Sequence, residues 1–204
     1  MLLDKNPRQS SDKIFVKIKS EFTNKNPNFV LSSKPFLKLE FLNNLITSYE
    51  IPIIYWDFDL LYTGYVRSGM LTKNNRIRIL CSDNTTFEKH IKEIIEIISK
   101  EQSLVILDSI NMLYNLFKDF DSIRFINSTI MILSSVAKNS ESSIIVTANT
   151  IKNEVGEWVL SPSGKHLIDS KNTGMYFLSD FDSKTVLNSI NKKLEFEKSF
   201  VMES

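Results

Sequence analysis

The sequence predicts a single α/β domain with a mainly parallel central sheet, helices on its faces and antiparallel edge strands at its C-terminus. Short continuous apolar runs alternate with helical segments along most of the chain, which is typical of parallel strands buried on both faces. Strand-like runs then follow one another at the end of the chain with no helical segment between them. The length of 204 residues suits one domain with a sizeable core.

The elements can be justified in chain order. Residues 14–22 alternate apolar and charged side chains, which favours a half-exposed strand within a polar N-terminal segment, 1–27. The core, residues 28–204, begins with the apolar run 28–31. The other strands are expected at 51–56, 76–80, 103–109, 142–149, 174–178, 184–190 and 197–202.

Three helices are expected between these strands. Residues 37–49 place Leu37, Phe41, Leu42 and Leu45 on one helical face. Residues 85–100 gather four isoleucines on one side, behind a Ser-Asp-Asn-Thr group that suits a helix N-terminus. Residues 123–139 are expected to form a long helix.

Composition and charge exclude several classes of protein. The net charge of +1 gives no overall attraction to nucleic acid or membrane, and no apolar run reaches the roughly 18 residues of a membrane helix. The first residues lack the apolar centre of a signal peptide. One cysteine, Cys81, excludes an internal disulfide. We therefore expect a cytoplasmic protein.

Polar residues end four of the predicted strands, and ligands bind at the carboxyl ends of parallel strands. The four blocks are SSKPFLKL (32–39), YWDFD (55–59), LVILDS (104–109) and IIVTAN (144–149). In order and spacing they resemble the ATPase core of the RecA/RadA recombinase superfamily. A looser match, residues 162–178, resembles the segment after the second DNA-binding loop of that family. The resemblance covers about residues 28–180 and implies a RecA-like P-loop NTPase fold.

The first block departs from a working phosphate-binding loop, GxxxxGK[ST]. In register, Ser32 and Leu37 replace the two glycines, Lys38 keeps the lysine, and Leu39 replaces the hydroxyl residue that binds magnesium. Pro35 also removes a backbone N–H donor. Candidate nucleotide-binding residues are Ser32, Ser33, Lys34 and Lys38. The missing glycines favour the structural interpretation of Lys38, a solvated residue of the following helix. The resemblance implies a degenerate ATPase with either no cofactor or ATP and magnesium bound weakly.

The other blocks supply the remaining candidates. By resemblance, Asp59 stands at the position of the catalytic glutamate that orients the attacking water, and Asp108 at that of the magnesium-binding aspartate. Asn149 stands where the family senses the γ-phosphate. Each also has a structural interpretation, as a carboxylate or amide that anchors a turn.

Basic residues indicate a second possible role, contact with nucleic acid. No acidic residue occurs from Leu60 to Ser82, a segment that contains Arg67, Lys73, Arg76 and Arg78. By resemblance, DNA-binding loops are expected near 114–122 and 152–165, and the second contains Lys152 and Lys165. A solvated surface would explain these charges as well.

The leading functional hypothesis is an accessory protein of DNA recombination or repair, similar to the RadA paralogues. Its expected partners are a RecA/RadA-like recombinase or a second copy of the chain, and single-stranded DNA. One alternative is an active but atypical ATPase. Another is a structural ring subunit resembling the Elongator accessory subunits.

Overall fold

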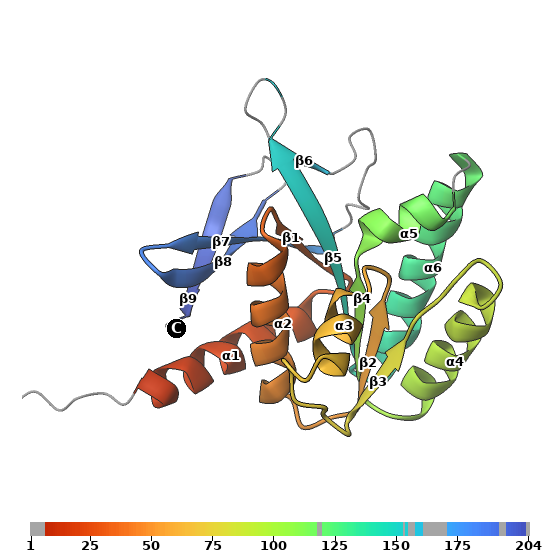
Figure 1. Ribbon diagram of the computed structural model, residues 1–204, viewed down its shortest axis with the longest axis horizontal. Helices are drawn as coiled ribbons and strands as arrows, with labels where there is room; N and C mark the ends of the chain where they lie inside the picture. The colour runs from red at the N-terminus through yellow and green to blue at the C-terminus, as the bar shows by residue number, and fades with distance from the viewer. Residues whose placement is uncertain are drawn as a thin grey trace, which may run out of the picture.

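The sheet is the frame of the protein, and a computed structural model describes it through residues 7–117, 120–152, 154, 158–160, 171–191 and 195–202. Of residues 7–12, 120–122 and 158–160 it describes the backbone alone. Within these ranges nine strands form one sheet in the order β3-β2-β4-β5-β1-β7-β8-β9, with β6 paired to β5 (Figure 1). The strands are β1 (Asn28–Ser32), β2 (Ile53–Asp57), β3 (Ile77–Leu80), β4 (Leu104–Asp108), β5 (Ser143–Lys152), β6 (Trp158–Leu160), β7 (Gly174–Phe181), β8 (Lys184–Ile190) and β9 (Phe196–Met202).

The pairing confirms the predicted fold class. Along the sheet, each neighbouring pair in the order β3-β2-β4-β5-β1-β7 is parallel. β8 and β9 then continue the sheet from β7 in antiparallel pairing. β1, β2 and β4 are buried at every residue because helices cover both faces of the sheet, whereas the edge strand β3 is only partly buried.

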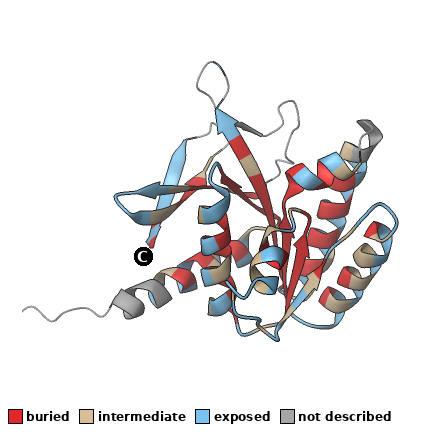
Figure 2. Cartoon of the chain, in the orientation of Figure 1, coloured by how far each residue is buried: buried red, intermediate tan, exposed pale blue. Residues whose placement is uncertain are grey.

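Six helices among the described residues form the two outer layers: α1 (Pro7–Asn24), α2 (Pro35–Ser48), α3 (Leu61–Arg67), α4 (Phe87–Lys100), α5 (Ile110–Leu116) and α6 (Phe120–Asn139). Successive strand residues point to opposite faces. Val30 of β1 packs in one core with α1, α2 and α3, whereas Phe29 and Leu31 pack in the other with α4, α5 and α6 (Figure 2). None of these helices is long and apolar enough to cross a membrane.

The strand expected at residues 14–22 is wrong, because this segment lies within α1. Its apolar residues fit two periods. Ile14, Val16 and Ile18 alternate as in a strand, but Phe15, Ile18 and Phe22 recur at helical spacing, and these three are the buried ones. Val16 is exposed. Packing against α2 and β9 therefore selects the helical period.

Candidate nucleotide site at the strand ends

The candidate site lies where β1, β2 and β4 end, beside Asn149 of β5 and beneath the first turns of α2. The register sets Asp57 of β2 beside Asp108 of β4, and Ser32 of β1 beside Asn149 of β5. The predicted strand-end residues thus do gather at one edge of the sheet, as a parallel arrangement requires.

Lys38 is the centre of this site. Its side chain is 0% exposed, and its Nζ lies 2.5 Å from Asp108 Oδ1 and 2.9 Å from Asp59 Oδ2. Asp108 is also 0% exposed, and Asp59 is 13% exposed at the mouth of the site. Lys38 is therefore a buried cation held by two carboxylates, not the solvated helix residue that the sequence also allowed.

Asp108 accepts hydrogen bonds from three side chains. Lys38 and the Thr147 hydroxyl, at 2.5 Å, donate to Oδ1, and the Tyr55 hydroxyl donates to Oδ2 at 2.5 Å. Burial, with the adjacent Asp108, raises the pKa of Tyr55 well above its usual value, so this phenol stays neutral and keeps its proton to donate. An ionised carboxylate has about four acceptor positions, so Asp108 is nearly saturated by the protein itself.

The two aspartates after β2 have different surroundings. Asp59 accepts from Lys38 and, at 2.7 Å, from the hydroxyl of Ser109. Asp57 is fully buried and accepts the Thr63 N–H at 2.7 Å through Oδ2, while its Oδ1 has no partner among the described residues. Burial raises the pKa of Asp57; the hydrogen bonds from Thr63 oppose this rise, and the neighbouring carboxylates add to it.

The charge state of Lys38 follows from its neighbours. Burial alone would lower the pKa of its ammonium group, but the attraction of Asp108 and Asp59 outweighs burial and raises it. Lys38 is accordingly charged at neutral pH, and it compensates part of the negative charge of three aspartates.

The connection between β1 and α2 is short. β1 extends to Ser32 and α2 begins at Pro35, so only two residues lie between them. The backbone N–H of Lys34 donates to the Ser32 hydroxyl at 3.2 Å, and the backbone N–H of Lys38 donates to the Lys34 carbonyl at 3.1 Å. The Lys34 ammonium pairs with Asp180 of β7 at 2.7 Å, and both side chains are exposed.

These residues fit a P-loop nucleotide with magnesium poorly. A phosphate cradle needs several backbone N–H groups turned toward one point. Here Pro35 has none, and those of Lys34 and Lys38 are used within the chain. Leu39, at the position of the metal-binding hydroxyl, is buried in the core. Among the described residues no group of three or more His, Cys, Asp or Glu side chains is arranged to hold a metal ion.

The side chain of Asn111 on α5 holds the backbone of Asn149 at the site by two hydrogen bonds. Asn111 accepts the Asn149 N–H at 2.7 Å and donates to its carbonyl oxygen at 3.1 Å. The side-chain oxygen of Asn149 is buried and has no partner among the described residues. The two bonds to its backbone fix Asn149 within β5 beside Ser32, whereas a phosphate-sensing role for Asn149 stays a prediction.

Comparison with solved structures identifies the architecture. The RadB recombinase aligns with a TM-score of 0.58 and 11% identity over 88% of this chain and 92% of its own. A DnaB-like replicative helicase, from a structure that reports its interactions with primase, aligns with a TM-score of 0.55 and 8% identity over 88% of this chain. The fold is RecA-like. This chain spans about half the length of the helicase chain, 54%. No protein-family model matches the sequence, and no curated protein matches it.

On this RecA-like fold the predicted nucleic-acid residues that the structure describes do not all lie together. Arg76 directly precedes β3, and Arg78 within β3 is level with Ile144 of β5 through the pairing of successive strands. Lys152 is eight residues further along β5, roughly 26 Å away along the strand at about 3.3 Å per residue. The sheet therefore does not bring Lys152 to the basic segment. Lys165 lies outside the described residues.

Within the basic segment, two arginines already have partners. Arg78 pairs with Glu93 of α4 at 2.6 Å, and Arg76 donates to the Tyr49 carbonyl. Arg67, at the end of α3, and Lys73, in the following loop, are exposed. Arg67 and Lys73 are thus the better candidates for contact with a phosphate backbone.

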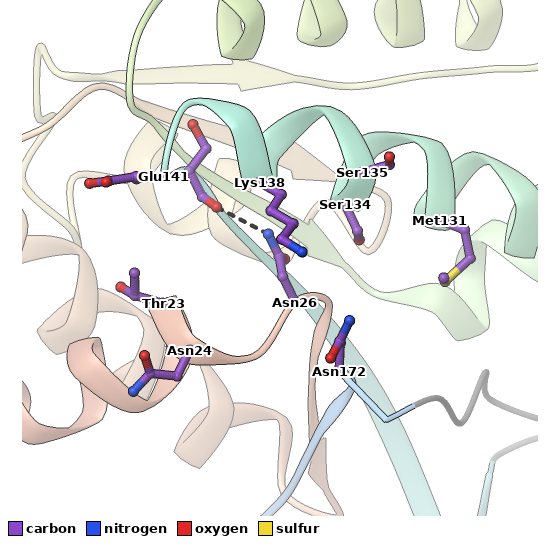
Figure 3. Close-up of a pocket in the computed structure, with 10 residues that line it drawn as sticks. Thr23, Asn24, Asn26, Met131, Ser134, Ser135, Lys138, Glu141 and Asn172 are labelled. Atoms are coloured by element: carbon purple, nitrogen blue, oxygen red, sulfur yellow. Dashed lines mark hydrogen bonds between the residues drawn. The ribbon is translucent and has the colours of Figure 1, made fainter.

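A separate polar cavity of about 420 Å³ opens between the end of α1, α6 and the turn before β7 (Figure 3). Asn26 joins these elements. Its side chain donates to the Ser142 carbonyl at 3.0 Å and accepts the Ile144 N–H at 3.0 Å, and its backbone N–H donates to Asn172. Asn26 uses its hydrogen bonds within the protein, on residues at or just before the starts of β5 and β7. This part of the cavity wall therefore attaches the end of α1 to the sheet.

Sequence reasoning missed the role of Tyr55 in the site. It treated Tyr55 only as part of a strand, although Tyr55 precedes Asp57 by two residues and must therefore point to the same face. That spacing was the available signal. The contacts from Thr63 to Asp57 and from Asp180 to Lys34 had no such signal, because they depend on α3 and on the register of β7.

Proposed function

We propose that this protein is a RecA-like accessory factor of DNA recombination or repair that acts without efficient ATP turnover. The observation that carries the proposal is the state of Lys38, which lies in the first turn of α2 and is buried and paired with Asp108 and Asp59. A lysine that serves a triphosphate must be free to reach it. Here two buried ion pairs would have to break first.

The structural comparisons support the RecA-like part of this proposal, because the RadB recombinase and the DnaB-like helicase each share the fold over 88% of this chain. The choice of recombination or repair rests on the resemblance of the four strand-end blocks to the RecA/RadA recombinases. A factor of this kind would act through contacts with a recombinase and with DNA.

Contact with nucleic acid is tested by measuring how tightly the protein binds a labelled single-stranded oligonucleotide. Fluorescence anisotropy monitors the binding at several salt concentrations. The double variant Arg67→Ala with Lys73→Ala is expected to reduce the salt slope by about 1.4, because each contact to single-stranded phosphate contributes about 0.7. The matched control is Lys17→Ala with Lys89→Ala, two exposed lysines outside this segment. Equal binding by both double variants would exclude the basic segment as the contact surface.

The second candidate function, an atypical ATPase, is favoured by one observation: Lys38, Asp59 and Asp108 do meet in one site. In that case a nucleotide would draw Lys38 away from the carboxylates. Magnesium-dependent release of phosphate from ATP that disappears in Asp108→Ala would support this candidate against the accessory role.

A further inference from the structure

α4 and α6 lie on the face of the sheet opposite α2 (Figure 1). An apolar groove runs between these two helices. It has a volume of about 220 Å³. Ile91 and Ile95 line it from α4, and Phe125 and Ile132 from α6. Phe125 is 42% exposed and Ile132 is 52% exposed. Single apolar side chains on a surface are ordinary, but large ones that share a groove mark an interaction site.

The charges beside the groove follow a regular pattern. Glu88 and Lys92 line it, and Glu96 and Lys100 continue the same row along α4. All four side chains are exposed, and the row alternates in sign at every fourth residue. Glu96 and Lys100 pair with each other at 2.6 Å, but both are about two-thirds exposed, so this pair contributes little and can exchange partners.

This pattern is complementary to itself when two α4 helices run antiparallel. Positions 88 and 100, and positions 92 and 96, lie at equal distances from Ile94. A twofold axis through the exposed face of α4, level with residue 94, would therefore set Glu88 opposite Lys100 of the second copy, and Lys92 opposite Glu96 of the second copy. Each pair would occur twice, as twofold symmetry requires.

We propose that the α4–α6 groove is the docking site of a second copy of this chain, in a closed symmetric dimer. The alternating row selects the partner and its direction, and the apolar side chains of the groove supply the buried area. A twofold interface uses the same surface on both copies, so the assembly stops at two. The proposal goes beyond the accessory function and does not depend on whether nucleotide or DNA is bound.

Sedimentation equilibrium of the wild-type chain, three groove variants and two control variants tests the proposal. We expect wild type to dimerise with a dissociation constant on the order of 10 μM, and Lys92→Glu to weaken the dimer about 10-fold or more, because two glutamates would then face each other. Adding Glu96→Lys to Lys92→Glu should restore much of the loss, because the pair is then reversed rather than broken. Ile132→Glu should also weaken the dimer.

Two matched controls separate the groove from general effects of charge. Lys138→Glu makes the same charge change on α6 at the polar cavity, and Val16→Glu makes the same apolar-to-acid change on the exposed face of α1. Both should dimerise as wild type does. A wild-type chain that remains monomeric to about 500 μM, far above the expected dissociation constant, would overturn the proposal. Equal weakening by Lys92→Glu and Lys138→Glu would also overturn it.

Discussion

Replacing Lys38 by methionine is expected to destabilise the protein by about 4 kcal/mol at neutral pH. Methionine keeps nearly the same volume, so the change removes the charge more than the packing. Asp108, which is fully buried, and Asp59 would lose their cation while Asp57 remains close by. Removing one partner of a buried ion pair typically costs about 3–5 kcal/mol, because the remaining charge is uncompensated.

A double-mutant cycle with Asp108→Asn isolates the ion pair. Asp108→Asn alone should cost about 3 kcal/mol, somewhat less than Lys38→Met, because Lys38 keeps Asp59 as a partner. The double variant has neither charge. It should therefore be more stable than the sum of the single effects predicts, by about 2 kcal/mol, which lies within the range measured for residues in contact.

Urea unfolding followed by far-UV circular dichroism measures the four free energies. Lys34→Met is the control, because it is the same substitution four residues away, at an ion pair with Asp180 that is exposed on both sides. It should leave the unfolding free energy unchanged within error. Single effects that add to within about 0.3 kcal/mol would refute the reasoning, because they would show that Lys38 and Asp108 do not stabilise each other.

Three further predictions concern other residues. The raised pKa of Asp57 means that the folded state binds the proton of this carboxyl more tightly than the unfolded state does. Wild-type stability should therefore fall as pH rises from about 4 through that pKa. The Asp57→Asn variant should lack this loss, so thermal unfolding at pH 7 should show it to be the more stable protein. Gly174→Ala should destabilise by about 2 kcal/mol or more in urea, because a Cβ there would lie 2.4 Å from Asn28 Oδ1 and 2.6 Å from the ring of Tyr176. Hydrogen bonds from Thr85 and Thr86 lower the pKa of Asp83 to about 2, so its carboxyl resonance should titrate near pH 2 by NMR; in a Thr85→Ala, Thr86→Ala variant, which keeps both backbone N–H donors, the pKa should rise toward its usual value of 3.8 but stay below it.

The regular part of the fold is predictable because its strands are continuous apolar runs. Burial on both faces leaves little choice for segments such as 104–108 and 143–148, and polar residues mark where they end. The meeting of Lys38, Asp59 and Asp108 follows from the same reasoning, since parallel strands deliver their ends to one edge.

The remaining elements could not be predicted from local pattern. α3 and α5 have seven residues each, too few to show a helical period, and neither has a side-chain cap at its N-terminus. α3 follows Leu60, whose left-handed φ of 57° is uncommon for a residue other than glycine. α1 fits two periods, and only its tertiary contacts decide between them.

The sequence predicts that Lys38 comes near Asp59 and Asp108, but not that it forms ion pairs with them. Its position in the motif suggested either a phosphate or solvent as its neighbour, whereas the side chain points into the sheet edge. This follows from the start of α2 at Pro35, which sets Lys38 in the helix itself, one turn after its beginning. The sequence shows that the glycines of a phosphate-binding loop are missing. It does not show that a connection of two residues, followed directly by α2, takes the place of that loop.

Calorimetric titration of ATP with magnesium into the wild-type chain tests the central claim most directly. The account predicts no saturable heat with ATP up to about 1 mM, because Lys38 is already paired and the backbone offers no cradle. Binding with a dissociation constant on the order of 10 μM, lost in a folded Lys38→Ala variant, would contradict it. Lys38 would then leave its carboxylates for a phosphate, and the site would be a working one.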